Sequence, residues 1–110
     1  MVARALLLLV LVLAGAPALY AEPATERYAP AQMRVAQDFL ERAIAAAARG
    51  DSARAGKLAW QARLDARLAW AMTESGALRA DAAEVGGAAS RLIARLAGRE
   101  HQSMRGLSER

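Results

Sequence analysis

The sequence predicts an all-α protein: an antiparallel helical hairpin whose long second helix continues as a coiled-coil-like segment. Alanine and leucine dominate the chain and β-branched residues are few, a composition that favours helix. Apolar residues recur at spacings of three and four, as they do on one face of a helix. The turn signal Gly50-Asp51 separates two such stretches, so we expect the chain to reverse direction there.

The first 21 residues differ from the rest of the chain and are typical of an export signal. Arg4 and the amino terminus supply positive charge, residues 5–16 form an apolar run, and small residues follow it. We therefore predict a signal peptide over residues 1–21. Cleavage after Ala21 and cleavage after Ala18 both fit, and the choice between them stays open.

An uncleaved membrane anchor is the alternative interpretation of this segment. The apolar run is shorter than the roughly 20 residues that a spanning helix needs, and Pro17 breaks it. No Cys follows the signal, so the chain lacks the residue that anchors a bacterial lipoprotein. We expect a soluble exported product with no integral membrane span after cleavage.

The charge balance argues against nucleic acid as a partner. The formal net charge of the 110 residues is only +4, and acidic and basic residues alternate along the expected helices instead of forming a basic stripe. The absence of Cys excludes a disulfide as support for so small a core. Long helices or self-association must supply that stability.

The first helix is expected over residues 30–49, after a polar lead at 22–29. Pro30 suits the first turn of a helix, where its missing N–H costs nothing. Gly50 suits the left-handed residue just past a helix end. The apolar face of this helix comprises Met33, Ala36, Leu40, Ala43, Ile44 and Ala47.

The turn lies in Arg49-Gly50-Asp51-Ser52, a tetrapeptide that is also the motif read by animal cell-adhesion receptors. A turn accounts for these residues better, because Gly50 ends one helix and Asp51 or Ser52 caps the next. We therefore predict a hairpin turn at Gly50, Asp51 and Ser52. So short a connection requires the two helices to pack antiparallel.

The second helix is expected over residues 52–96 and carries two apolar stripes on opposite sides. One stripe consists of alanines together with Leu58, and its small side chains let the first helix approach closely. The other keeps a heptad phase through Gly76 and the Gly86-Gly87 pair, so we predict no break there. A break at either place is the open alternative, with a third helix folding back after the glycine pair. The second stripe supplies the candidate interaction residues Trp60, Leu64, Leu68, Leu78, Val85, Leu92 and Leu96.

Hydrophobic burial is the reason to expect an interaction. The first helix cannot cover both stripes, and each Leu or Trp side chain left in water forgoes about 1.5 to 3 kcal/mol. We therefore expect self-association, or docking on another protein, through the second stripe. Residues 98–110 are polar, contain two glycines and are expected to be disordered.

No constellation in the sequence supports catalysis, and we expect no enzyme activity. His101 is the single histidine and Cys is absent, so neither a metal site nor a cofactor site is predicted. The acidic residues stand near Arg or Lys at helical spacing, which favours exposed ion pairs over acid–base chemistry. Asp65 is the exception, because it lies between the two stripes and is placed to bond across to the first helix. No phosphate-binding loop or nucleophile elbow is present.

Four short motifs follow one another along residues 28–71: Tyr28-Ala29-Pro30, Gly50-Asp51, Leu58-Ala59 with Ala62, and Asp65-Ala66 with Leu68-Ala69. In this order and spacing the segment resembles the family called domain of unknown function 4398, small exported helical proteins of Gram-negative bacteria. The likeness extends loosely to Leu96. It implies a periplasmic or outer-envelope location and a hairpin similar to tetratricopeptide units, but no activity. The chain departs from the family at Ser52, where many members carry an aromatic residue.

These features predict a non-enzymatic protein of the periplasm or cell envelope of a Gram-negative bacterium, acting as a structural or protein-interaction module. Its partner is expected to be a second copy or another envelope protein. The alternative is a chaperone-like or client-binding module in which Trp60, Leu64 and Leu68 form a transient groove.

Overall fold

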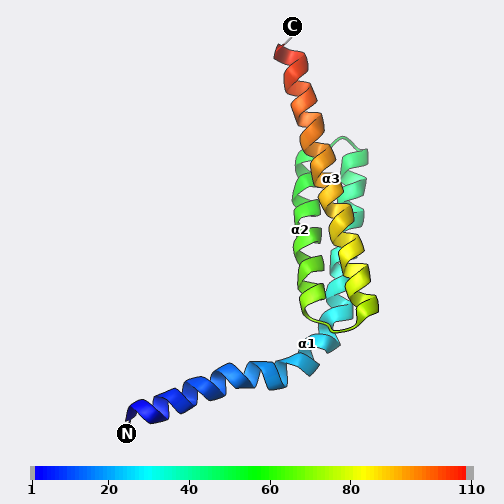
Figure 1. Ribbon diagram of the computed structural model, residues 1–110. Helices are drawn as coiled ribbons and strands as arrows, with labels where there is room; N and C mark the ends of the chain where they lie inside the picture. The colour runs from blue at the N-terminus through cyan, green and yellow to red at the C-terminus, as the bar shows by residue number, and fades with distance from the viewer. Residues whose placement is uncertain (1, 109–110) are drawn as a thin grey trace.

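The computed structural model describes the backbone of residues 2–108 and the side chains of residues 25–108. This part of the chain contains the helices α1 (Val2–Ala48), α2 (Ser52–Ala71) and α3 (Gly76–Ser108), and no strand (Figure 1). The all-α prediction is therefore confirmed. The molecule is elongated, with principal extents of 76 × 32 × 18 Å.

Helix α1 begins far earlier than the predicted start at Pro30. It runs from Val2 and includes the stretch 22–29, which was expected to be a polar lead. The ribbon changes direction in the light-blue part of α1, before this helix enters the bundle (Figure 1). Pro23 and Pro30 stand near this part of the chain, and a proline inside a helix removes a backbone hydrogen bond and favours a kink. The side chains of residues 1–21 lie outside the described residues, so the signal peptide stays a prediction.

The turn between α1 and α2 is built from backbone hydrogen bonds around Gly50. This residue has a φ of 81°, the left-handed conformation that a side chain disfavours. The Gly50 N–H donates to the carbonyl oxygen of Ala47 at 3.0 Å, and the Asp51 N–H donates to that of Ala46 at 2.9 Å. This pair of bonds is the Schellman arrangement that closes a helix C-terminus. The Asp51 carboxylate then accepts from the Arg54 N–H at 3.2 Å and caps α2.

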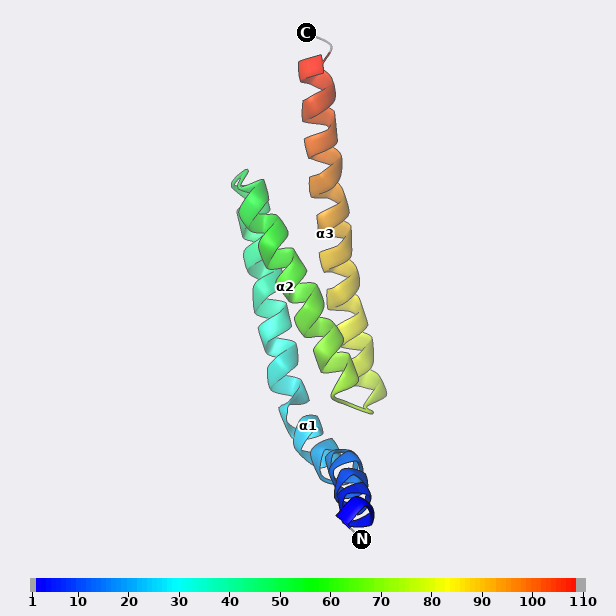
Figure 2. The ribbon, with the colours of Figure 1, turned by 90° about the vertical axis from the view of Figure 1, so that its left-hand side faces the viewer.

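The prediction of a single helix over residues 52–96 is wrong. Helix α2 ends at Ala71, and residues 72–75 form a turn that reverses the chain into α3 (Figure 2). The hydroxyl of Ser75 accepts from the Leu78 N–H at 3.3 Å and so caps α3. Of the two breaks left open, the structure therefore has the one beside Gly76.

Side chains from three helices hold this second turn. The Glu74 N–H donates to Oε1 of Glu26, on α1, at 2.8 Å. Arg79 of α3 donates through Nε to the Thr73 carbonyl oxygen at 2.8 Å. The same guanidinium lies 4.2 Å from the ring centroid of Trp70, the distance of a cation–π contact. The turn is therefore tied to α1, α2 and α3 at once.

The heptad pattern concealed this break. Ala71 and Leu78 are seven residues apart, and the turn at 72–75 leaves that spacing unchanged. An unbroken helix would gain a few backbone hydrogen bonds worth about 0.5 to 1.5 kcal/mol each. Folding back buries apolar side chains of α3 such as Val85 and Leu96, worth about 1.5 to 3 kcal/mol each when buried fully. Burial outweighs the lost bonds, so the chain turns.

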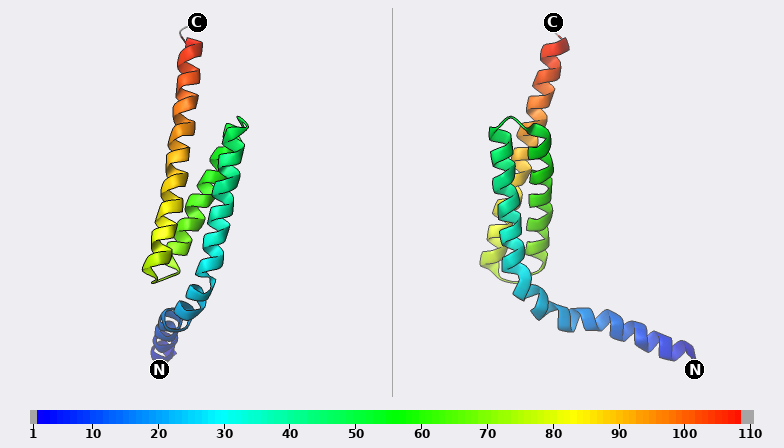
Figure 3. Two further views of the ribbon diagram at one scale, coloured as in Figure 1. Left: turned by 90° about the vertical axis from the view of Figure 1, so that its right-hand side faces the viewer. Right: turned by 180° about the vertical axis from the view of Figure 1, so that it is seen from behind.

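Alanines form most of the core between the three helices. Eleven of the fourteen buried apolar residues within 25–108 are alanine. Helix α2 lies between α1 and α3 and is packed by both (Figures 2 and 3). Its buried residues, which we call the alanine face, are Ala55, Ala59, Ala62, Ala66 and Ala69. Small side chains let the helices approach closely, but each buries little apolar area.

Helix α3 runs without a break through the Gly86-Gly87 pair, as the heptad pattern predicted. The open alternative of a break at this pair is therefore wrong. A methyl group at Gly86 would lie 3.8 Å from the Cβ of Ala66, which shows how closely α3 approaches α2. Residues 98–108, expected to be disordered, are helical and exposed and extend past the end of the bundle (Figure 1). Helical hydrogen bonds are internal to the segment, so a polar stretch can continue a helix without a tertiary partner.

We predict that Gly50→Ala destabilises the protein and that Gly56→Ala stabilises it. Neither added methyl group meets an atom within 4 Å, so only the backbone conformation distinguishes the two sites. Ala in the left-handed conformation of Gly50 costs about 1 to 2 kcal/mol. Ala at the helical Gly56 gains about 0.5 to 1 kcal/mol. Urea unfolding followed by circular dichroism measures both free energies, and a shift of the same sign at both positions would contradict the turn.

Candidate interaction surfaces

The seven residues predicted to share one stripe lie in two different places. Four of them point toward α1 and α2 and belong to the core: Leu78, Val85, Leu92 and Leu96. Val85 and Leu96 are only 8% and 7% exposed. The chain itself therefore buries Val85 and Leu96 and partly covers Leu78 and Leu92.

The other three residues form an exposed face on α2. Trp60, Leu64 and Leu68 follow one another at four-residue spacing and are 48%, 50% and 50% exposed. Since α1 and α3 both pack against the alanine face, this opposite side of α2 is left to solvent. We call Trp60, Leu64 and Leu68 the outer face of α2.

The two indole rings have different surroundings. Arg63 places its guanidinium carbon 4.6 Å from the ring centroid of Trp60, a cation–π contact that orients the ring at one end of the outer face. The buried Nε of Arg63 has no hydrogen-bond partner, so the stacking accounts for its position. Trp70 instead stacks on Arg79 and supports the turn before α3. The two rings are almost equally exposed, at 48% for Trp60 and 46% for Trp70, but only Trp60 belongs to the outer face of α2.

Asp65 joins α2 to α1 by the bond that its position predicted. Its Oδ1 accepts from Nε2 of Gln32, on α1, at 3.0 Å. Its Oδ2 accepts from Nε2 of Gln61, one turn earlier on α2, at 3.1 Å. One carboxylate oxygen thus joins α2 to α1, and the other forms a bond within α2.

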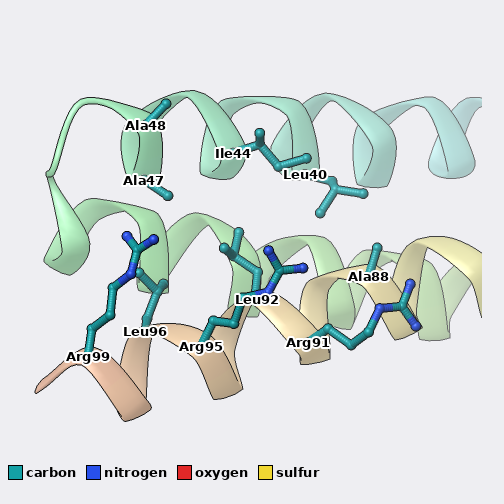
Figure 4. Close-up of a pocket in the computed structure, with 10 residues that line it drawn as sticks. All are labelled: Leu40, Ile44, Ala47, Ala48, Ala88, Arg91, Leu92, Arg95, Leu96 and Arg99. Atoms are coloured by element: carbon teal, nitrogen blue, oxygen red, sulfur yellow. The ribbon is translucent and has the colours of Figure 1, made fainter. Parts of the chain in front are cut away.

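A groove of about 320 Å³ lies between α1 and α3 (Figure 4). Leu40 and Ala47 of α1 and Leu92 and Leu96 of α3 point into the space between the two helices. Ile44, which is 54% exposed, lines the same space. Three arginines of α3 stand along one edge: Arg91, Arg95 and Arg99. We call this apolar channel with its basic edge the arginine groove.

No described acidic side chain lies within ion-pair distance of the arginines of this groove. They stand at i, i+4 and i+8 on α3, and each neighbouring pair of like charges destabilises a helix by about 0.2 to 0.5 kcal/mol. Among the side chains described, the one ion pair within 4 Å joins Arg42 to Asp38 on α1, at 3.1 Å. The groove therefore presents concentrated and uncompensated positive charge.

Sequence reasoning did not identify the arginine groove. The repeat of Arg91, Arg95 and Arg99 is visible in the sequence, and its like-charge spacing was the available signal. The apolar floor opposite comes from α1, which only the fold brings alongside α3.

The outer face of α2 exposes apolar side chains, and the arginine groove combines apolar side chains with positive charge. Both features suit the binding of a partner. Within the part of the chain that the structure describes, no three His, Cys, Asp or Glu side chains gather as a metal site would require. No helix among these described residues has the length and apolar character needed to cross a membrane.

No protein-family model, curated protein or solved structure matches this chain. The resemblance to domain of unknown function 4398 therefore stays a prediction that rests on the motifs quoted above. The fold and the two surfaces define a small helical bundle that keeps alanine inside and places large apolar and basic side chains outside.

We predict opposite tolerance to a carboxylate at Leu64 and Leu96. Leu64→Glu places the charge in solvent and changes the free energy of unfolding by less than about 0.5 kcal/mol. Leu96→Glu buries a charge in the core and costs about 3 kcal/mol or more. Urea unfolding is measured at the lowest practical protein concentration, where self-association contributes nothing. Equal losses from both variants would contradict the assignment of Leu64 to the surface.

Proposed function

We propose that the protein is a non-enzymatic interaction module of the Gram-negative cell envelope that self-associates through the outer face of α2. One observation carries the proposal: the large apolar side chains of α2 are half exposed, whereas its buried face is alanine. A monomer would be more stable if the large apolar side chains of α2 were buried and its alanines were exposed. The existing placement suits a chain whose large apolar groups are covered by a partner.

The free energy of burial supports self-association. Each buried methyl or methylene group contributes about 0.8 kcal/mol, so a core made of alanine contributes little for its number of residues. A chain of this size is marginally stable even with larger core residues. Covering the exposed halves of Trp60, Leu64 and Leu68 would add about 1 kcal/mol for each side chain in each copy.

The spacing of the outer face suits a two-fold dimer. Trp60 and Leu68 are equally far from Leu64 along α2. An antiparallel pair of α2 helices centred on Leu64 would set Trp60 of each copy against Leu68 of the other. Such a contact uses the same patch twice, as a closed two-fold dimer requires. The 20 residues of α2 span about 30 Å, which gives the contact useful length.

The proposed location rests on the sequence. The predicted signal peptide and the resemblance to domain of unknown function 4398 both favour the periplasm. The described buried residues begin at Ala29, after both candidate cleavage sites, so cleavage would leave that core in place. The antiparallel α1 and α2 support a tetratricopeptide-like hairpin, whereas the end of α2 at Ala71 argues against a coiled-coil continuation.

A chaperone-like or client-binding module is the second candidate function. The observation that favours it is a wider groove of about 670 Å³ between α2 and α3, lined by Trp60, Ile93 and Ala97 among others. An extended apolar segment of a client would fit beside the outer face. Solution mass separates the two functions, because a client-binding protein stays monomeric until a client is added.

We predict that the purified protein is a dimer and that Leu64→Glu makes it monomeric. Two carboxylates brought together at the centre of a two-fold contact repel each other and lose their hydration. Light scattering coupled to size-exclusion chromatography measures the mass of each variant. The matched control is Val35→Glu, which places the same charge at a 43% exposed apolar site on α1 and leaves the dimer intact. A wild-type monomer at all concentrations would exclude self-association.

We also predict that export removes the first residues of the chain. Produced in a Gram-negative host, the protein is expected in the periplasmic fraction with Leu19 or Glu22 as its first residue. Intact-mass spectrometry of that fraction identifies the bond that is cut. Recovery of the uncut chain from the cytoplasm would contradict the signal-peptide prediction.

A further inference from the structure

We propose that the arginine groove between α1 and α3 binds an acidic amphipathic helix of a different protein. The inference concerns a surface other than the outer face of α2 and does not depend on self-association. It rests on the shape of the groove, on the spacing of its charges and on the acidic residues of this chain.

The shape of the groove suits a helix laid lengthwise. Its lining runs from Leu40 to Ala48 on α1 and from Ala88 to Arg99 on α3, stretches of about 12 and 16 Å at the helical rise per residue. Both walls are helices, and side chains of a third helix can enter the ridge and groove pattern between them. An apolar stripe at i, i+3, i+4 and i+7 is the usual anchor in such a groove. The bound helix would complete a four-helix arrangement.

The spacing of the charges distinguishes a helix from other anionic ligands. Arg91, Arg95 and Arg99 are spread over about 12 Å at one position per turn. Carboxylates at i, i+4 and i+8 of a neighbouring helix repeat at the same interval, so each can meet one guanidinium. A single anionic headgroup would engage only one end of this row. Guanidinium groups bind carboxylates through two parallel hydrogen bonds, which favours arginine for such pairing.

Repulsion between Arg91, Arg95 and Arg99 destabilises α3 when no partner is bound. Each of the two neighbouring pairs destabilises the free helix, and carboxylates opposite would remove that repulsion. The exposed Ile44 and the partly buried Leu40 and Leu92 would be covered in the same step. Apolar burial and charge pairing therefore favour the same occupant.

A second copy of this chain does not supply the matching helix. Its acidic residues include no three at successive four-residue intervals, and only Glu22 and Glu26 stand four apart. Glu41 stands beside Leu40 in the sequence but does not line the groove, and Asp38 is already paired with Arg42. The complementary helix must come from another protein.

The experiment uses the purified protein and a synthetic peptide as the probe. The peptide is a helix with leucines at i, i+3, i+4 and i+7 and a flanking row of three glutamates four residues apart. A second peptide carries glutamine at the same three positions, and a third carries lysine. Fluorescence anisotropy is expected to show that the glutamate peptide binds about tenfold more tightly than the glutamine peptide, with an affinity that falls as salt rises.

Variants of α3 test whether the groove is the binding site. Arg95→Glu is expected to weaken the glutamate peptide about tenfold and to bind the lysine peptide in its place. Arg105→Glu is the matched control on the same helix, outside the groove lining, and is expected to leave the affinity unchanged. Arg95→Gln removes the charge without reversing it and is expected to give an intermediate loss. Circular dichroism checks that all variants keep the helical content of the wild type.

Several results would overturn the proposal. Equal affinity for the glutamate and glutamine peptides would show that charge has no part in the binding. An unchanged affinity in Arg95→Glu would place the peptide elsewhere. Binding of dodecyl phosphate with no binding of the glutamate peptide would make the groove a site for anionic amphiphiles. Light scattering of Arg95→Glu reports the dimer separately, so a failure here is distinguishable from a failure of self-association.

Discussion

The methyl groups of the alanine face set how closely α1 and α3 can approach α2. Two helices share this one face, so a longer side chain at Ala62 or Ala66 would move at least one of them outward. The hydrogen bonds that join the helices act only over a narrow range of distance. Gln32 with Asp65 and Glu26 with the Glu74 N–H both need the close approach that alanine permits. The arrangement of the bundle therefore depends on the small volume of the side chains on the buried face of α2.

The same constraint accounts for the character of the surface. Since the interior accepts few large groups, the large apolar residues of α2 and several of α1 lie outside, among them Trp60, Leu64 and Ile44. The two resulting surfaces differ in symmetry. The outer face of α2 repeats evenly about Leu64 and is suited to a second copy, whereas the arginine groove carries one sign of charge and needs an unlike partner. A bundle with only three helices can thus present two separate contacts.

Local chemistry in the sequence predicted part of this structure. The left-handed Gly50 and the capping Asp51 are short-range features, and the structure has both. The turn at 72–75 escaped prediction because its length preserved the heptad spacing, although Ser75 is a capping residue in the sequence. Periodicity shows which residues share a helix face but not what covers that face. Leu92 and Leu96 of α3 were therefore assigned to a partner, although α1 and α2 of the same chain pack against them. The arginine groove required α1 and α3 side by side, which no local pattern encodes.

The alanine face also affects the tendency of the chain to aggregate during its synthesis. The N-terminal part of a chain emerges first, so α1 and α2 can pair before α3 has been synthesised. Before α3 is made, the side of α2 that will pack against it exposes alanine methyl groups. Leucines are the more usual residues at such a helix interface. Exposed apolar area is what draws incomplete chains into aggregates. A core of alanine therefore makes the unfinished protein a poor nucleus for misassembly.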